Sequence, residues 1–337
     1  MHGCSRRYGF REPIVALLIA LGWSSVSPAA DLASTWRDDA SLNSVFFVGS
    51  KNGYAVGAQG AIWRTADSGL TWQPVASGVT SQLNSVCFLT DQIGWVAGSE
   101  ISPFTGLDTG VLLFTENAGA TWRRLGDGNL PPITYVRFFG LEEGVIVGRP
   151  STDVPSGIMK TKDSGKTWQP VIGSTNAPWR AACFVEPDMG AVGGPEGRLS
   201  LVGGEQLLTS KLPQQGLRTI RAVTVLPDDS GWLAGDGGLV LRTSSGGVVW
   251  ESPETLLPDE LRIGMDFRAV ESRGTTVWLI GSPGSVVWHS ANNGRNWQRY
   301  LTGQSAPLNS LRFMNDALGV AVGEFGAIIR TEDGGRG

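Results

Sequence analysis

The stretch RTADSGLTW (64–72) decides the fold class, because it recurs along the chain with few changes. The further copies are FTENAGATW (114–122), KTKDSGKTW (160–168), RTSSGGVVW (242–250), HSANNGRNW (289–297) and the shorter RTEDGGRG (330–337). Upstream of each copy lies a second motif, in which one glycine stands four residues before another, as in GYAVG (53–57). Two motifs that recur together in a fixed order indicate a repeat protein.

The second motif gives the period of the repeat. Its closing glycines are Gly57, Gly98, Gly148, Gly194, Gly235, Gly281 and Gly323. Neighbouring closing glycines are 41 to 50 residues apart, a period typical of solenoids and propellers. In the first unit, residues 42–48, 53–57, 61–65 and 71–75 each have the pattern of a short strand, and turn-forming residues separate them.

Seven such units predict an all-β protein. Four short antiparallel strands per unit, with no helical period in any unit, predict a seven-bladed β-propeller of four-stranded blades. The units are expected to start near residues 42, 83, 133, 179, 220, 267 and 308 and to form one domain over 31–337. An outermost strand near 34–37 (STWR) is expected to complete blade seven. The alternative is a natural chain that continues beyond residue 337.

The nine-residue motif is expected to form a structural turn, called the Asp box below. An Asp or Asn side chain in such a turn accepts backbone N–H groups two residues on, and the following glycine provides a positive φ. The residues in this position are Asp67, Asn117, Asp163, Asn292 and Asp333. The box tryptophans, which bring large apolar area between the layers, are Trp72, Trp122, Trp168, Trp250 and Trp297. Blade four has lost its box, with Gly204 in the aspartate position, and blade five carries Ser245 there.

Scarce residue types exclude several kinds of site. After residues 1–30, interpreted below as a signal, the sequence keeps one histidine, His289, and two cysteines, Cys87 and Cys183, so zinc sites built on several of these are excluded. No unit offers the clustered carboxylates that calcium needs, so neither a metal nor a cofactor is expected. The cysteines occupy equivalent positions in blades two and four, too far apart for a disulfide. His289 is interpreted as a solvated turn residue.

Residues 1–30 have the features of an export signal. Three arginines at 6, 7 and 11 precede the apolar run 14–21, and small residues at 27–30 offer a cleavage site. The run is too short to span a bilayer, so the protein is expected to be exported, to the periplasm or, in a photosynthetic host, to the thylakoid lumen. The net charge is −4, and without residues 1–30 it is 24 − 30 = −6, which argues against a nucleic-acid partner.

The nine-residue motif resembles the Asp-box (BNR) repeat of bacterial neuraminidases. The whole unit, in which LNSV leads to the glycine motif and then to RTxDxGxTW, is similar to that of the photosystem II stability/assembly factors over about residues 34–337. The resemblance implies a non-enzymatic, exported seven-bladed propeller. It would act as a scaffold that binds a protein partner, a membrane-protein subunit or an assembly intermediate, while a membrane complex is built. Such a protein is expected to be a monomer that associates at most peripherally with a membrane.

The alternative is a carbohydrate-active or carbohydrate-binding propeller. Sialidases share the Asp boxes, but their early Phe/Tyr-Arg-Ile-Pro signature is absent from this sequence. Their Tyr-Glu pair would need Tyr54, Tyr135 or Tyr300, and Tyr54 occupies a strand position expected to be core. A glycosidase with two carboxylates is compatible with the residue counts, although no motif places such a pair. A carboxylate pair in an open central pocket would favour an enzyme, and a band of arginines there would favour a binding protein.

Three arginines mark the first candidate partner-binding site. Alignment of the first strands places Arg180 and Arg221 in one position, and Arg268 falls there with one gap. Other blades have Asn43, Asn84 and Asn309 in this position. Arg137 and Arg312 lie three positions further along their strands. Because arginine binds carboxylates in a bidentate manner, this rim is expected to hold an acidic tail or backbone carbonyls of the partner. The alternative is that these arginines are solvated or paired with local carboxylates.

Two neighbouring hairpins form the second candidate site. From the closing glycine to the box Thr, blade two has 17 residues and blade three has 13, against 8 in blades one, five and seven. The extra segments, 99–110 and 149–157, contain Phe104, Asp108 and Asp153. Extra length on two adjacent blades favours a binding role, and the alternative is a pair of tolerated surface insertions.

Overall fold

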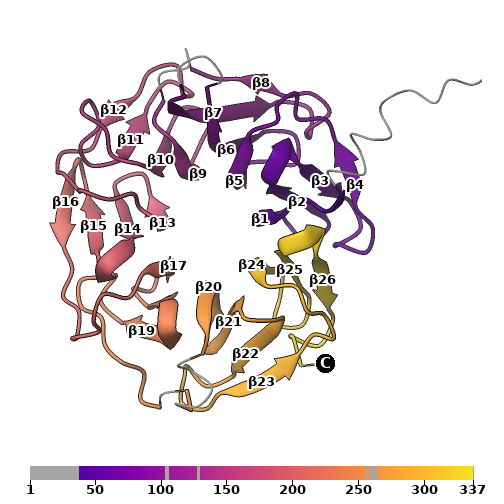
Figure 1. Cartoon of the computed structure of the whole chain (residues 1–337), viewed down its shortest axis with the longest axis vertical. Helices are drawn as coiled ribbons and strands as arrows, with labels where there is room; N and C mark the ends of the chain where they lie inside the picture. Colours follow the sequence, from indigo (N-terminus) through magenta and orange to yellow (C-terminus); the bar gives the residue numbers. More distant parts are fainter. Residues whose placement is uncertain (1–37, 103–105, 127–129, 256, 259–263, 337) are drawn as a thin grey trace, which may run out of the picture.

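The computed structural model describes residues 38–102, 106–126, 130–255, 257–258 and 264–336. Seven antiparallel sheets surround a central channel, and strands that are consecutive in sequence are neighbours in each sheet (Figure 1). The fold is therefore a seven-bladed β-propeller, which confirms the prediction from the repeats. The expected signal (1–30) and the expected closing strand (34–37) lie outside the described residues.

The first four blades each have four strands. Blade one consists of β1 (Leu42–Val48), β2 (Asn52–Gly57), β3 (Ile62–Thr65) and β4 (Gln73–Val75). Blade two consists of β5 (Gln82–Phe88), β6 (Gly94–Ile101), β7 (Asp108–Thr115) and β8 (Arg123–Arg124). Blade three consists of β9 (Ile133–Phe138), β10 (Gly144–Gly148), β11 (Ile158–Thr161) and β12 (Gln169–Pro170). Blade four consists of β13 (Ala181–Glu186), β14 (Met189–Gly193), β15 (Leu199–Gly203) and β16 (Gln206–Thr209).

Blade six also has four strands, whereas blades five and seven have three within the described residues. Blade five consists of β17 (Ile220–Val225), β18 (Gly231–Gly235) and β19 (Leu239–Thr243). Blade six consists of β20 (Asp266–Arg273), β21 (Thr276–Ser282), β22 (Val286–Ser290) and β23 (Gln298–Leu301). Blade seven consists of β24 (Leu308–Phe313), β25 (Gly319–Gly323) and β26 (Ile328–Thr331). Short 3-10 turns follow the second strand in four blades: η1 (Ala58–Gly60), η2 (Pro195–Gly197), η3 (Asp236–Gly238) and η4 (Glu324–Gly326).

Aromatic rings from neighbouring blades stack face to face. Tyr54 of β2 is fully buried and stacks on Phe88 of β5 with ring centroids 3.7 Å apart, and Trp95 of β6 stacks on Phe138 of β9 at 3.8 Å. Each Phe ring also covers the opening glycine of its own blade. A Cβ on Gly144 would lie 2.7 Å from the ring of Phe138. The first glycine of the motif therefore makes room for a ring that joins two blades.

The closing glycine allows two backbone segments of the same blade to cross closely. A Cβ on Gly57 would overlap the carbonyl oxygen of Ser41, just before β1. The same overlap occurs at Gly98, Gly148, Gly235, Gly281 and Gly323. The recurrence of glycine at this position thus follows from a steric requirement that six blades share.

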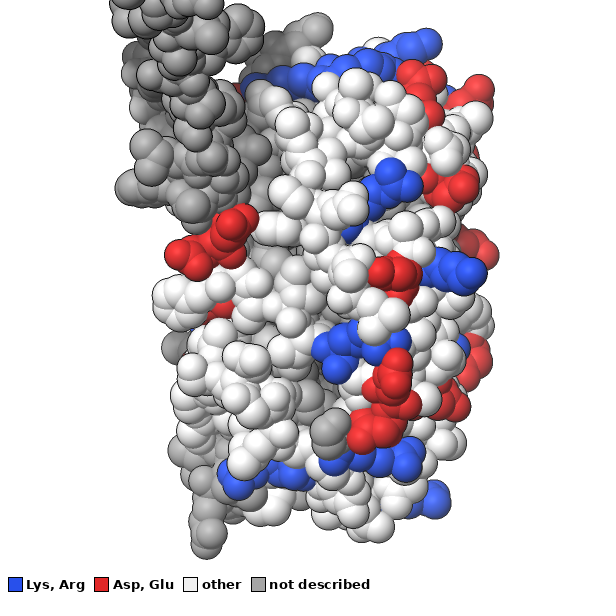
Figure 2. Space-filling model, turned by 90° about the vertical axis from the view of Figure 1, so that its right-hand side faces the viewer, with Lys and Arg blue, Asp and Glu red and all other residues white. Residues whose placement is uncertain are grey.

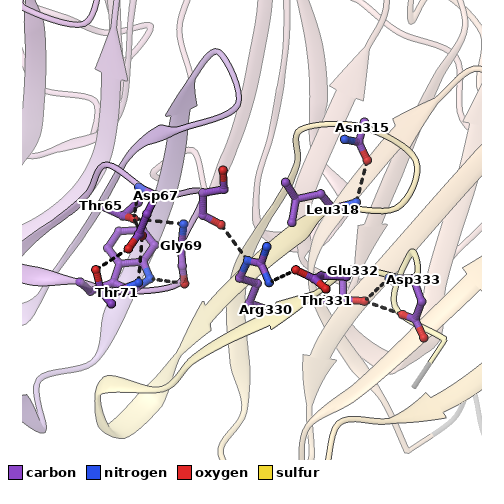
Figure 3. Close-up of polar contacts among 12 residues, drawn as sticks. Thr65, Asp67, Gly69, Thr71, Asn315, Leu318, Arg330, Thr331, Glu332 and Asp333 are labelled. Atoms are coloured by element: carbon purple, nitrogen blue, oxygen red, sulfur yellow. Dashed lines mark hydrogen bonds and ion pairs between the residues drawn. The ribbon is translucent and has the colours of Figure 1, made fainter.

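The Asp box is a hydrogen-bonded turn in which Thr65 and Asp67 act together (Figure 3). The Asp67 carboxylate accepts the Thr71 N–H at 2.9 Å and the Thr71 hydroxyl at 2.6 Å, four residues on. The N–H two residues on, that of Gly69, donates instead to the Thr65 hydroxyl at 3.0 Å. The expectation that Asp67 would accept from two residues on was therefore wrong, because Thr65 already occupies that donor. These bonds hold the pKa of Asp67 down to about 2.

Equivalent bonds occur in the other boxes. Asn117, Asp163 and Asn292 accept the N–H four residues on, and the Ser245 hydroxyl does the same in blade five. Asp333 accepts the Arg336 N–H at 3.0 Å. Of the box tryptophans, Trp250 is buried, and the half-buried ones are Trp72, Trp122, Trp168 and Trp297. The described parts of the boxes therefore act as turns that fix the outer edge of a blade.

Side chains join the last blade to the first. Arg330 of β26 reaches across to blade one and donates from Nε to the Ser68 carbonyl at 2.9 Å (Figure 3). Nearer the channel, the Val45 N–H donates to the Ser310 hydroxyl, and Asn309 donates to the Leu42 carbonyl at 2.9 Å. The ring is thus closed by contacts between inner strands as well as between Asp boxes.

One expectation about the strands needs correction. His289 is not a solvated turn residue: it lies within β22, is 4% exposed and packs against Trp278. The strand continues to Ser290, and the box turn begins after that residue. The Ser290 hydroxyl accepts the Gly294 N–H of the turn. Burial lowers the pKa of His289. Cys87 and Cys183 are both free thiols.

The box geometry gives a direct stability test. Asp67→Ala removes the acceptor for Thr71 and is expected to lower Tm by about 2–4 °C, the effect of losing roughly one net hydrogen bond. Asp67→Asn keeps an acceptor in place, as Asn117 does in blade two, where it accepts the Thr121 N–H at 2.9 Å. In thermal unfolding at pH 7, the Tm of Asp67→Asn should fall by less than half as much as that of Asp67→Ala. Equal losses in the two variants would show that the charge, not the acceptor, stabilises the turn.

Candidate partner-binding site in the central channel

The first strands of all seven blades line the central channel, whose cavity has a volume of about 540 Å³. Near its start, nearly every first strand contains a β-bulge, as between Leu42 and Ser44 in β1. The residues at this bulge position are Asn43, Asn84, Thr134, Arg221, Arg268 and Asn309. Arg180 lies just before β13. Its distance in sequence from the closing glycine Gly194 equals that of Asn43 from Gly57. A bulge turns its extra side chain away from the regular alternation, so these residues form one ring around the channel, called the bulge ring.

Four members of the bulge ring tie neighbouring blades together. The amide nitrogens of Asn43 and Asn84 each donate at 2.8 Å to a backbone carbonyl at the start of the next first strand. Asn309 does the same from blade seven to blade one at 2.9 Å, and the Thr134 hydroxyl donates to the Trp179 carbonyl at 3.3 Å. The bulge position is therefore structural in blades one, two, three and seven.

In blades four, five and six, arginine replaces the Asn or Thr at this position, and within the described residues only Arg268 of blade six still contacts the next blade. Arg180 is exposed and has no ion pair with any other described residue. Arg221 forms an ion pair with Asp236 of its own blade, and Arg268 contacts Glu324 at 2.6 Å and the Asn309 side chain at 2.7 Å, both in blade seven. The structure thus brings the three arginines to one rim of the channel. Local carboxylates hold two of them, as the alternative interpretation stated.

Three positions further along lies a second ring. Pairing to the second strands aligns Phe46, Cys87, Arg137, Cys183, Thr224, Glu271 and Arg312. Arg137 lies between the two cysteines in blade order, and its buried Nε has no hydrogen-bond partner. Burial raises the pKa of both thiols, more strongly than the nearby Arg137 lowers it. Both cysteines are therefore poor nucleophiles at neutral pH.

Glu271 is a channel residue that the sequence analysis missed. Its side chain is 10% exposed, accepts the Phe313 N–H at 3.0 Å and lies 3.7 Å from the Arg312 guanidinium. Burial raises its pKa to about 7, against the opposing effect of Arg312. Among the described residues that line the channel, Glu271 is the one acidic residue, beside five arginines. Its position opposite Trp278, equivalent to those of Arg137 and Arg312, was the available signal, because it places a carboxylate in the ring that already holds these two arginines.

The two long hairpins lie against each other at one point. Asp108, at the start of β7, forms an ion pair with Arg149 of blade three at 3.2 Å. Asp153 is exposed in the turn that precedes β11, whereas Phe104 lies outside the described residues. The structure therefore connects the two insertions through Asp108, which is already partnered.

Comparison with known proteins identifies the family. The family model for the photosynthesis system II assembly factor YCF48 matches residues 33–174 and 209–337. The chain belongs to this family. The family consists of assembly factors, and the chain is a non-enzymatic member of it. The internal stretch that the family model leaves unmatched, 175–208, covers most of blade four, where the Asp box is lost.

Individual relatives are more distant. The chloroplastic photosystem II stability/assembly factor HCF136 of Arabidopsis thaliana is 25% identical over 310 residues, 82% of this chain and 72% of that protein. The photosystem II assembly lipoprotein Ycf48 of Synechococcus sp. (strain CC9902) is 32% identical over 112 residues, 31% of each chain. A solved structure of YCF48 bound to D1 peptide has a TM-score of 0.67 at 23% identity and covers 87% of this chain and 92% of that one.

Carbohydrate-active propellers share the fold alone. A xyloglucanase from Xanthomonas campestris has a TM-score of 0.68 at 13% identity and covers 88% of this chain and 52% of that one. Among the described residues, no group of three or more His, Cys, Asp or Glu side chains is placed so that it could hold a metal ion. The same residues contain no helix long and apolar enough to cross a membrane.

On the side shown in Figure 2, basic and acidic side chains are interspersed, unlike the arginine-rich channel.

Glu271 makes the stability of the protein depend on pH. Its pKa is about 7 in the folded protein and 4.5 when unperturbed, so the folded state binds more protons between these values. The resulting stabilisation is present below about pH 4.5 and is lost as pH rises through 7, by about 2–4 kcal/mol. Glu271→Gln keeps an acceptor for Phe313 and is expected to be more stable than the parent at pH 8, with little difference at pH 5.

Chemical denaturation of both proteins from pH 5 to 8 measures this difference. Glu116→Gln, a change at an exposed box residue, serves as the control and should shift stability equally at all pH values. A Glu271→Gln curve parallel to that of the parent would contradict the assignment of a protonated, buried carboxyl.

Proposed function

We propose that the protein is an assembly or stability factor that holds an acidic or carboxyl-terminal segment of a membrane-protein subunit at the arginine rim of its channel. The observation that carries this proposal is the charge of the channel lining, in which five arginines face one acidic residue. A channel built for glycoside hydrolysis would need a pair of carboxylates there. Family membership supports the proposal, as does the relative whose solved structure contains a bound D1 peptide.

The chemistry of the rim fits such a ligand. A guanidinium group offers parallel N–H donors that match a carboxylate, and Arg180 has these donors unpaired with any described acid. Arg221 and Arg268 are held by Asp236 and Glu324, so their positions are fixed before a ligand arrives. A carboxylate would then bind chiefly to Arg180, and carbonyl oxygens of the segment would meet the remaining donors of the other two. Arg137 and Arg312 lie three positions further along their strands and would contribute positive potential.

Location and state of assembly follow from the same proposal. Relatives described as a lipoprotein and as chloroplastic support an exported protein, which would act in the periplasm or, in a photosynthetic host, in the thylakoid lumen. It would work as a monomer that meets its partner at the membrane surface and binds peripherally. The second candidate site, around Asp108 and Asp153, would contact the same partner outside the channel.

Reversal of charge at the rim tests the proposal. Arg180→Glu is expected to weaken binding of a labelled decapeptide rich in Asp and Glu with a free carboxyl terminus by about tenfold, because a carboxylate would then face a carboxylate. Fluorescence anisotropy measures the affinity. Arg299→Glu, the same change on the exposed outer strand β23, should alter it less than about twofold.

Two outcomes would overturn the proposal. One is equal binding by the parent and Arg180→Glu. The other is equal affinity of the parent for the acidic peptide and for its Asn/Gln counterpart with an amidated end.

A further inference from the structure

Within the described residues, blade five has no fourth strand, and its outer edge is paired at Arg242 but not at Val240. Alternate residues of β19 direct their backbone groups outward, and Arg242 exchanges two hydrogen bonds of 2.8 Å with Glu251 there. Val240 lies two residues before Arg242 in β19, and Gly238 lies two residues before Val240. The Gly238 N–H donates to the Met265 carbonyl at 2.6 Å. Between these partners, the outward N–H and C=O of Val240 have no backbone partner among the described residues, although Val240 is only 7% exposed. In Figure 1, β19 is the outermost strand of its blade.

A proline explains the missing pair. In blades one, two and three, the residue three after the box Trp pairs with the position equivalent to Val240. In blade one, Val75 pairs with Ile62. In blade two, the Leu125 N–H donates to the Leu112 carbonyl, and in blade three the Val171 N–H donates to the Ile158 carbonyl. In blade five the equivalent residue is Pro253. Because proline has no N–H, it cannot donate to the Val240 carbonyl, and the fourth strand ends after Glu251.

A groove occupies the place of the missing strand. It has a volume of about 520 Å³, and its lining includes Val240, Pro253, Leu217 and Trp297. Leu217 is 82% exposed, an unusual position for a large apolar side chain beside a sheet edge. The Trp297 Nε1 is buried without an acceptor among the described residues, as is that of Trp122, whereas Trp72, Trp168 and Trp250 donate to their box glycines. The Gln215 Oε1, also in the lining, has no donor.

The groove carries one charge. Arg218 is the single charged residue among the described residues that line it, and it forms no ion pair with the rest of the described chain. The surroundings therefore offer an unpaired cation, exposed apolar surface and the backbone donor and acceptor of one strand position. An extended segment with alternating apolar and acidic side chains matches all three features.

We propose that the edge of β19 binds an extended segment of a partner protein, which pairs with blade five at Val240, between the contacts that Gly238 and Arg242 already make. The segment pairs with the N–H and C=O of Val240, directs an apolar side chain toward Leu217 and Trp297, and places a carboxylate against Arg218. The site lies on the third strand of its blade, away from the channel lining, so it is separate from the arginine rim and its occupancy does not depend on Arg180.

A labelled nonapeptide that alternates valine and glutamate serves as the probe. Two further peptides have the same sequence with methylated backbone nitrogens. In one, every valine is N-methylated, and in the other every glutamate is. Each modification removes the N–H donors along one edge of the extended peptide. The parent protein should bind one methylated peptide about as well as the probe and the other about tenfold more weakly. Hydrogen exchange of the Val240 amide should slow when the probe binds. Equal affinities for the two methylated peptides would overturn the proposal.

Variants of the protein give a second test. Pro253→Val restores the residue type of blade one, so the chain's own fourth strand should pair with Val240. This variant is expected to have a higher Tm than the parent and to bind the probe about fivefold more weakly. Arg218→Gln should weaken it by about threefold, whereas Arg299→Gln on β23 should leave it unchanged. Arg180→Glu should also leave it unchanged, which separates this proposal from that for the channel.

Two results of these variants would refute strand addition by a partner. One is a Pro253→Val protein of raised Tm that still binds the probe like the parent. The other is a parent protein that ignores the probe but dimerises in sedimentation experiments, with Pro253→Val monomeric, since the edge would then pair with a second copy of the chain.

Discussion

The contact between a Phe ring and the opening glycine of its blade is the constraint on which the packing of successive blades depends. The ring needs the space of a missing Cβ, and in blades two, three and seven it presents its other face to an aromatic ring of the preceding blade, as Phe138 does to Trp95. A box tryptophan then meets the edge of the same ring: the centroids of Phe138 and Trp168 are 6.3 Å apart at 84°. Stacked and edge-on rings bury large apolar areas in a fixed geometry, so one residue sets the spacing of two blades.

Blade six shows how this constraint is met when the Phe is absent. Its first strand has Ser272 in that position. Trp232 of blade five lies over the box glycine Gly294 instead, where a Cβ would overlap its ring, and it meets Trp297 edge-on at 5.9 Å. A glycine and two aromatic rings are thus kept, although different residues provide them. The packing requirement is a property of the junction between blades, not of a single motif position.

Because the rings and glycines fix the blades, the bulge ring is free to vary in chemistry. Asn43, Asn84 and Asn309 use the position for one blade-to-blade hydrogen bond each, a net contribution of about 1 kcal/mol. The loss of that bond in blades four and five is small beside the buried apolar area of a blade, and in blade six Arg268 makes a blade-to-blade contact of its own. Arginine can therefore occupy the position without unfolding its blade, and its bulge directs it into the channel. Structural redundancy is what leaves the rim available for the binding proposed above.

The sequence was sufficient to predict the parts of the molecule that repeat. The number of blades and the places of Arg180, Arg221 and Arg268 follow from counting between glycines. The missed features depend on contacts between residues far apart in sequence. The burial of Glu271 is a property of a completed ring, and the role of Thr65 in the box follows from hydrogen bonds that spacing alone does not distinguish. Pro253 stood in the sequence as a strand breaker, but its consequence at Val240 required the pairing register.

The departures from the repeat gather in one half of the ring. Blade four lacks its box, blade five lacks a paired outer strand, and blades four to six carry the rim arginines, whereas blades one and two keep every motif. In a repeat protein each unit contacts chiefly its neighbours, so a lost box or strand weakens one blade and leaves distant junctions intact. Regular blades can then hold the ring closed while irregular ones lose local hydrogen bonds. The open edge of β19 and the unpaired Arg180 both lie in that irregular half, where unsatisfied donors and acceptors remain for a partner.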